Sequence, residues 1–438
     1  MRRPVWLLAI SILVCRVRPT MTAASADLEG LFPGGRDHPA IGYPTRRVQN
    51  TVSQLNVEIG QDLVHLQFDG VKGYLRSVLD ALDVPIESQI VVFSKTSLMS
   101  PIISPGHPRS IFFNDRVAVA WVPGEPFIEV AAVDPRQGVV FYTLDQGPAY
   151  RPRFVRSDYC LVCHESYGSL GVPGMLVRSV FPAPTGLPVR TLGDYTTDDR
   201  SPWKERWGGW YVTGKHVTAD HMGNATFADS GEPSGAAGTP ESLAGKFDTS
   251  AYLTPYSDVV ALMVFEHQAH LINLLTRVGW EVRYAMYEGR LRNTPLDQRL
   301  LLDTASEVVD YLPFVDEAPL AGPSSPDGSP GKVQGSSGFT ARFEAAGPRD
   351  TKGRSLRQLD LDRRLMRYPC SYMIYSAAFD SLPDPAKAAI YRRMWQVLSG
   401  EEKGSRYARL TPDSRRAVVE ILRETKPGLP DYFMPVVL

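Results

Sequence analysis

The chain is poor in cysteine, in net charge and in long apolar runs, and each shortage excludes a class of protein. Its 438 residues include four cysteines, and only Cys160, Cys163 and Cys370 follow the N-terminal segment. Three thiols cannot form the framework of a disulfide-stapled domain. A formal net charge of −1 gives no reason to expect binding to nucleic acid or to anionic membranes.

The one clear apolar run lies at the N-terminus. Arg2 and Arg3 precede an apolar stretch from Pro4 to Cys15, and Ala24-Ser25-Ala26 fits a small-residue cleavage site. The stretch is shorter than the roughly 20 residues that a membrane span needs. We therefore expect residues 1–26 to be a signal peptide and the mature chain to be exported, periplasmic or extracellular, with no integral membrane segment.

The remaining composition is that of a globular protein with a large core, since 43% of residues are apolar and 10% aromatic. We predict an α+β fold: an antiparallel sheet region, then a loop-rich region, then a helical C-terminal part. Periodicity predicts a helix over 71–82, and a long helix after Asp258, which can cap it. Helices are also expected after Asp384-Pro385 and Thr411-Pro412. The predicted strands are 90–93, 111–113, 117–122, 127–133 and 139–144.

The domain boundaries follow from composition. Residues 27–320 are expected to form an α+β domain, in which 146–256 are rich in Gly, Pro, Trp and Tyr and have little periodicity. Residues 321–338, dense in Gly, Ser and Pro, are typical of a flexible loop or linker. Residues 339–438 are expected to be mostly helical, in a region that can pack on the main domain.

One motif carries chemistry. Cys160-Leu161-Val162-Cys163-His164 is C-x-x-C-H, the spacing at which two thiols bond the vinyl groups of a haem while the adjacent imidazole reaches the iron. Export agrees with this interpretation, because c-type haem is attached outside the cytoplasmic membrane. We predict one covalently bound haem c, with Cys160 and Cys163 as anchors and His164 as the proximal iron ligand. The α+β domain of residues 27–320 is therefore expected to be a haem-binding domain, with its loop-rich region as the haem-binding region.

Two other interpretations of the cysteine pair remain open. A thiol redox pair of the thioredoxin kind needs a βαβ setting, which the surrounding sequence lacks. A zinc site formed by Cys160, Cys163, His216 and His221 has the ligand types of Cys2His2, but 52 residues separate Cys163 from His216. That gap is far longer than in a zinc finger.

The sixth iron ligand has several candidates in the sequence. His221 is the first choice because it lies in a polar, Gly-flanked loop where a histidine has no reason of packing to be. The alternatives are an open sixth position and five other side chains: His216, Met175, Met222, His267 and His270.

Several further residues have both a chemical and a structural interpretation. Glu266 and His270 are four residues apart on one helix face, but buried histidines paired with polar neighbours explain them better than a metal does. Cys370 is more typical of an inert buried thiol than of a nucleophile. The tryptophans at 203, 207 and 210 suit a haem face and an ordinary aromatic core equally well.

With these motifs, the chain resembles a family of uncharacterised, exported bacterial proteins that contain a cytochrome c domain with a single C-x-x-C-H motif. The resemblance implies haem binding and electron transfer, and it modestly favours a ligand among His216 and His221. Relatives tend to have glycine where this chain has Val217. The resemblance rests on six segments: 88–97, 113–115, 141–145, 160–164, 207–214 and 353–357.

The function predicted from these features is that of an exported monohaem c-type cytochrome-like protein that transfers electrons through iron ligated by His164. Its partner would be a redox protein or a small-molecule donor or acceptor. The size of the chain keeps a second candidate open: a haem-dependent oxidoreductase or peroxidase with an open or displaceable sixth ligand. A zinc-stabilised binding protein is the third.

Overall fold

The computed structural model describes residues 35–97, 101–218, 220–234, 238–291, 294–320 and 331–434. The signal peptide predicted at 1–26 lies outside them. The described residues from Arg36 onward belong to one compact unit, and all features below are within it.

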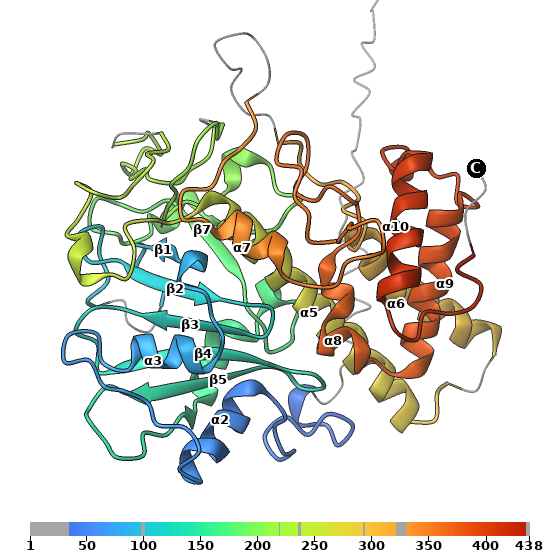
Figure 1. Ribbon diagram of the computed structural model, residues 1–438, viewed down its shortest axis with the longest axis horizontal. Coiled ribbons are helices and arrows are strands. Elements are labelled where there is room, and N and C mark those ends of the chain that lie inside the picture. Colours follow the sequence, from blue (N-terminus) through green and yellow to red (C-terminus); the bar gives the residue numbers. More distant parts are fainter. Residues whose placement is uncertain are drawn as a thin grey trace, which may run out of the picture. The chain divides into compact units, whose positions relative to one another are not determined.

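A mixed α+β architecture is confirmed, with an antiparallel sheet at its centre (Figure 1). Within the described residues the sheet has seven strands in the order β6-β5-β4-β3-β2-β1-β9. All five predicted strands are present, within a few residues of their predicted ends. The strands are β1 (Ile90–Val92), β2 (Arg109–Phe113), β3 (Val117–Trp121), β4 (Phe127–Asp134), β5 (Gly138–Asp145), β6 (Val155–Arg156) and β9 (Trp210–Tyr211).

Two side-chain-stabilised turns set the register of the central strands. In the β2–β3 hairpin, Asn114 Oδ1 accepts hydrogen bonds from the N–H groups of Arg116 and Val117 at 2.9 and 3.0 Å. Asp134 Oδ1 accepts two more, from the N–H groups of Arg136 and Gln137, between β4 and β5. Because side chains alternate along each strand, these turns decide which residues share a face.

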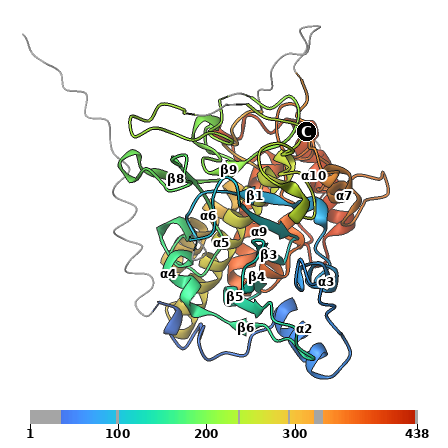
Figure 2. The same cartoon turned by 90° about the vertical axis from the view of Figure 1, so that its left-hand side faces the viewer.

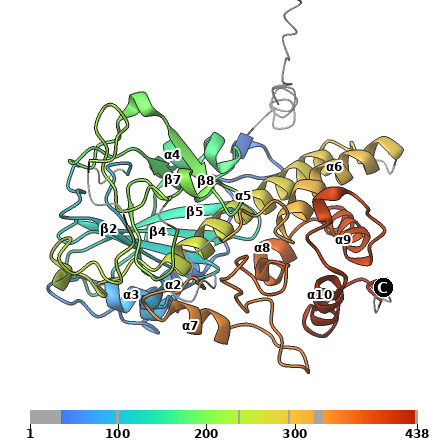
Figure 3. The same ribbon diagram turned by 90° about the horizontal axis from the view of Figure 1, so that it is seen from above.

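The two faces of the sheet are covered differently (Figures 2 and 3). Helices α2 (Thr51–Gly60) and α3 (Leu75–Ala81) lie on one side, and α3 confirms the helix predicted over 71–82. On the other side are the short helix α4 (Leu161–His164) and a two-stranded ribbon of β7 (Val177–Val180) and β8 (Asp194–Thr197). The C-x-x-C-H motif therefore lies over one face of the sheet.

The long helix α5 (Val259–Tyr287) is the core helix of the unit. Asp258 caps it as predicted, its Oδ1 accepting from the N–H groups of Val260 and Ala261 at 2.8 and 3.1 Å. Phe265 packs on Phe113 of the sheet at 4.9 Å between ring centroids. Among the described helices, α5 alone is long and apolar enough to cross a membrane, but 94% of its most apolar window is buried.

The C-terminal helices pack with one another and against α5, as shown in Figure 1. The predicted helices after Pro385 and Pro412 are both present; Gly400 ends the first with φ +80°, and Thr411 caps the second. The sequence prediction missed α2 and α6. The helices are α6 (Pro295–Tyr311), α7 (Phe339–Ala345), α8 (Ala377–Asp380), α9 (Asp384–Ser399) and α10 (Pro412–Thr425).

Part of the predicted linker is bonded into the fold. Residues 321–330 lie outside the described residues, whereas 331–338 are held by backbone and side-chain hydrogen bonds. Gln334 pairs with Lys215, and Asp258 Oδ2 accepts from the N–H groups of Ser336 and Ser337 at 2.7 and 2.8 Å. The same aspartate thus caps α5 and fixes the described part of this segment.

Candidate functional site

The C-x-x-C-H motif forms a compact helical turn. The 3-10 turn η3 (Asp158–Cys160) runs directly into α4 (Leu161–His164). Positions i, i+3 and i+4 of a helix share one side, so Cys160, Cys163 and His164 are neighbours. Both thiols are free, that of Cys160 partly buried and that of Cys163 exposed.

His164 is oriented by a second segment of chain. Its Nδ1 lies 2.9 Å from the carbonyl oxygen of Gly174, which can only accept, so Nδ1 carries the proton. The N–H of Gly174 donates back to the His164 carbonyl at 2.9 Å. Nε2 has no hydrogen-bond partner among the described residues, and in this tautomer its lone pair is free to bind a metal.

Helix α5 fixes this partner segment. Asn273 donates from Nδ2 to the carbonyl of Met175 at 2.7 Å. A Cβ at Gly174 would overlap the Asn273 side chain, so only glycine permits this close approach. The orientation of His164 therefore depends on the core helix as well as on its own turn.

A cavity of about 530 Å³ lies beside the motif, and we call it the motif cavity. Cys160, Cys163 and His164 all line it, as does Phe141, whose ring centroid is 4.7 Å from that of His164. Its volume is in the range of cofactor sites.

The floor of the motif cavity is made of small side chains. Ala118 and Ala120 of β3 and Ala131 of β4 line it, and the register pairs Ala118 with Ala131 and Ala120 with Ile111. Residues paired across strands project from the same face. The three alanines leave space on a sheet face where larger residues would fill it.

Two ion pairs supply the polar lining. Arg109 Nη2 lies 2.7 Å from Glu129 Oε2, and Arg178 Nη2 lies 2.6 Å from Asp194 Oδ2. Arg109 and Glu129 are mostly buried, and Arg109 Nε is buried without a hydrogen-bond partner among the described residues. A guanidinium with a spare buried donor suits an anionic group inside the cavity.

The rim of the motif cavity is apolar and exposed. Tyr159, Val162 and Tyr167 line it and are 65%, 71% and 94% exposed. Such a group of exposed apolar side chains is typical of a binding surface.

Burial disfavours the charged forms of His164 and Cys160. It lowers the pKa of His164, which favours the neutral imidazole that ligates metals. It also raises the pKa of the Cys160 thiol, so this side chain is not poised as a thiolate nucleophile. A βαβ setting for a thiol redox pair is also missing around α4, which follows the antiparallel strands β5 and β6.

His221, the first choice for a sixth ligand, lies outside the lining of the motif cavity. Its Nε2 is 2.7 Å from the Thr239 hydroxyl, and its Nδ1 accepts from the N–H of Gly223 at 3.0 Å. Its ring also packs on Trp207, 5.4 Å away, and burial lowers its pKa to about 4. Both ring nitrogens are thus engaged in a local structural role.

Of the other candidates for the sixth position, only Met175 lines the motif cavity. Met222 is buried near the Ser179 hydroxyl, 3.7 Å from its sulfur. His216 is half-buried and takes a left-handed backbone conformation, with φ +56°.

The described residues do not bring together the ligands of the zinc site considered above. No group of three or more His, Cys, Asp or Glu side chains in the described residues is arranged to hold a metal ion. Cys160 and Cys163 line the motif cavity, whereas His216 and His221 do not. A structural zinc ion needs four protein ligands together, and the described arrangement does not bring these four together.

The histidines of α5 belong to a buried polar network. His267 Nε2 lies 2.7 Å from the Ser371 hydroxyl and Nδ1 lies 3.3 Å from Asp199 Oδ1. This is the order of a hydrolytic triad, but all three residues are at most 4% exposed, so a substrate could not reach Ser371. Glu266 is buried with Arg206, 3.4 Å away, and its pKa is raised by burial to about 7.

Of the remaining residues singled out in the sequence, one lines the motif cavity and others are buried in the core. Trp210 lines the motif cavity, whereas Trp207 is fully buried and packs on Trp203 at 5.2 Å. Cys370 is buried, and desolvation raises its pKa to about 12, as for an inert thiol.

Comparisons of the chain with protein-family models, with curated proteins and with solved structures give no match. The functional conclusion therefore rests on the site itself.

Proposed function

We propose that this protein is an exported monohaem c-type cytochrome-like electron carrier. Cys160 and Cys163 would hold one haem through thioether bonds in the motif cavity, and His164 would ligate its iron. The observation that carries the proposal is that both thiols and a histidine with a free Nε2 line one cofactor-sized cavity.

Each part of the motif cavity would have a separate role. The Gly174 carbonyl holds His164 in the tautomer that ligates through Nε2 and makes the imidazole a stronger donor. The alanine floor admits a flat group against the sheet, and Arg109 can pair with a carboxylate. When bound, the haem supplies an iron that cycles between the ferric and ferrous states.

Electron transfer is supported by the exposed rim. Val162 lies between the two cysteines and is 71% exposed, so the edge of a group bonded to them would lie near the surface. The exposed rings of Tyr159 and Tyr167 offer a redox partner apolar contact area beside that edge.

The electron-transfer proposal predicts a low-spin iron with both axial positions filled. Absorption and electron paramagnetic resonance spectra of the purified haem protein should be low-spin, with reversible reduction and little reaction with carbon monoxide or peroxide. A high-spin, ligand-reactive iron would contradict electron transfer as the main role.

A haem-dependent oxidoreductase or peroxidase is the second candidate. It is favoured by one observation: His164 is the only described histidine that lines the motif cavity, while the Arg109–Glu129 pair does line it. An open sixth position beside a buried cation and carboxylate can bind and polarise a small ligand. The high-spin outcome of the same experiment would select this candidate.

The placement of His221 gives a further prediction. Replacing His221 with alanine should leave the absorption spectrum of the haem protein unchanged, because the side chain lies outside the motif cavity. The loss of its hydrogen bonds to Thr239 and Gly223 should lower the free energy of unfolding by about 2 kcal/mol, measured by chemical denaturation. A change from low-spin to high-spin iron would show instead that His221 reaches the haem.

Met175→Leu is the matched variant that tests another side chain proposed as a sixth ligand. Met175 lines the motif cavity, and leucine nearly conserves its volume. A spin-state change in this variant alone would assign Met175 as the sixth ligand.

A further inference from the structure

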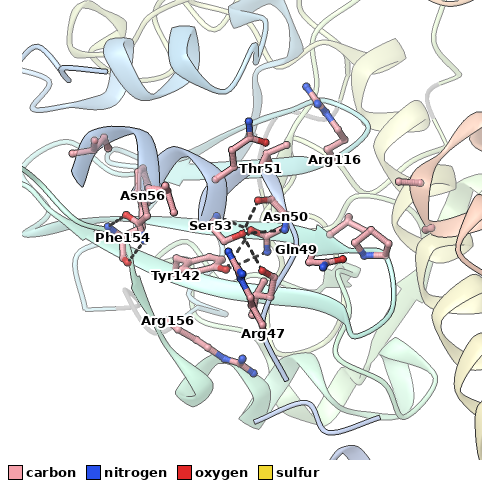
Figure 4. A pocket seen from close by; sticks show the side chains of 18 of the residues that line it. Arg47, Gln49, Asn50, Thr51, Ser53, Asn56, Arg116, Tyr142, Phe154 and Arg156 are labelled. Carbon is pink, nitrogen blue, oxygen red and sulfur yellow. Dashed lines mark hydrogen bonds between the residues drawn. The ribbon is translucent and has the colours of Figure 1, made fainter. Parts of the chain in front are cut away.

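A second, larger cavity of about 1310 Å³ has no part in the haem proposal. It is lined mainly by α2 and the residues just before it, and by residues within 115–116, 151–156 and 373–378, and we call it the arginine cleft (Figure 4). It is close to the motif cavity, because adjacent residues of β5 make contacts at the two sites. Phe141 contacts His164, whereas the next residue, Tyr142, bonds through its hydroxyl to Asn50 of the cleft at 3.2 Å.

The charge of the arginine cleft is strongly one-sided. Its lining holds one acidic residue, Asp115, and neither glutamate nor lysine. The whole chain has a net charge of −1, so this lining is a local concentration of positive charge rather than a general property. Five arginines line it: Arg47, Arg116, Arg151, Arg153 and Arg156.

Two of the five arginines and the single acid are already paired. Arg151 forms an ion pair with Asp62, and Arg156 lies 3.0 Å from Asp158. Asp115 is paired with an arginine outside the lining, Arg357. The only carboxylate of the cleft lining is thus already paired with Arg357, and it also interacts electrostatically with Arg116.

Three arginines remain without a hydrogen-bond or ion-pair partner. The side chains of Arg47, Arg116 and Arg153 are exposed and make no hydrogen bond or ion pair with the part of the chain that the structure describes. Each guanidinium presents a fork of donors that matches a carboxylate or a phosphate.

Neutral polar groups lie among these cations. In Figure 4, Gln49 and Asn50 lie between Arg47 and Arg116, at the beginning of α2. The Asn50 amide is already bonded to Tyr142 and Ser53. The hydroxyl of Thr51, also in the lining, is buried without a hydrogen-bond partner among the described residues. A buried polar group without a partner at a cation-lined cavity is the kind of group that a ligand satisfies.

We propose that the arginine cleft binds a small anion that carries at least two phosphate or carboxylate groups. Its concave form and volume suit a small molecule, and the separate unpaired guanidinium groups can hold more than one anionic group. The assignment does not depend on haem binding.

Isothermal titration of the full mature chain with pyrophosphate, and separately with citrate, tests the assignment. Wild type should bind at least one probe saturably at one site per chain, and the preferred probe tells a phosphate ligand from a carboxylate ligand. The triple variant Arg47→Gln/Arg116→Gln/Arg153→Gln should weaken binding by at least about tenfold. Because these side chains have no partners, the thermal midpoint should stay unchanged.

The control is a second triple variant, Arg190→Gln/Arg342→Gln/Arg423→Gln. It removes the same charge from arginines that are outside the cleft lining and make no side-chain pair in the described residues. It should bind as wild type does. Equal weakening in both variants would mean general attraction to a positive surface and would overturn the assignment, as would no binding of either probe to wild type.

Discussion

Replacing Cys160 and Cys163 together with serine should abolish covalent haem, from one per chain to none. The two side chains share one side of a helical turn and both line the motif cavity, so no other thiol can take their place. Each single variant keeps one thioether anchor and should retain part of the haem. The readout is a haem-stained denaturing gel with a pyridine haemochrome spectrum, on chain exported from a host with c-type haem maturation.

Cys370→Ser is the matched control, since it removes the one described thiol that lies outside the motif. Cys370 is buried among the C-terminal helices and lines no part of the motif cavity. It should keep a full complement of covalent haem. Retention of haem by the double variant, or its loss from the Cys370 variant, would show that the C-x-x-C-H motif is not the attachment site.

Larger side chains on the floor of the motif cavity should exclude haem while the C-x-x-C-H residues stay unchanged. The double variant Ala118→Leu/Ala120→Leu projects two larger side chains from β3 into the cavity. Overpacking against a bound haem should reduce the haem content per chain on the order of tenfold. The measurement is the ratio of haem absorbance to protein, with circular dichroism to establish that the variant folds.

The stability of the same variant distinguishes a motif cavity that holds haem from one that is empty. If nothing fills the motif cavity in the mature protein, the two leucines fill space and should raise the free energy of unfolding by about 1 kcal/mol. A more stable variant with an unchanged haem content would place the haem elsewhere and contradict the proposal.

Much of the sheet could be predicted from the sequence, because its strands are short runs of β-branched and aromatic residues with turn residues between them. The helix α2 was missed because its buried residues, Val52, Leu55 and Ile59, form only a short stripe. Its capping box between Asn50 and Ser53 was the available signal.

The motif could be predicted from the sequence, but its surroundings could not. Arg109 and Glu129 come together only through the pairing of β2, β3 and β4, and no local pattern indicates this. The alanine floor likewise depends on register, although the alternation in Val117–Trp121 was a partial signal. The role of Gly174 depends on contact with a helix about a hundred residues later in the chain.

The preference for His221 as a sixth ligand depended on local sequence alone. A polar, Gly-flanked loop suggested a histidine without a packing role. In the fold, this loop turns back so that His221 packs on Trp207 and bonds to Thr239 and Gly223. The local pattern does not reveal the contacts with Trp207 and Thr239, because these residues lie outside the loop.

The most direct test of the central claim is the intact mass of the mature chain, exported from a host with c-type haem maturation and measured under denaturing conditions. The proposal predicts the mass of the polypeptide plus one haem, with the added mass mapped to the peptide that contains Cys160 and Cys163. The mass of the bare polypeptide, with both thiols free, would contradict it.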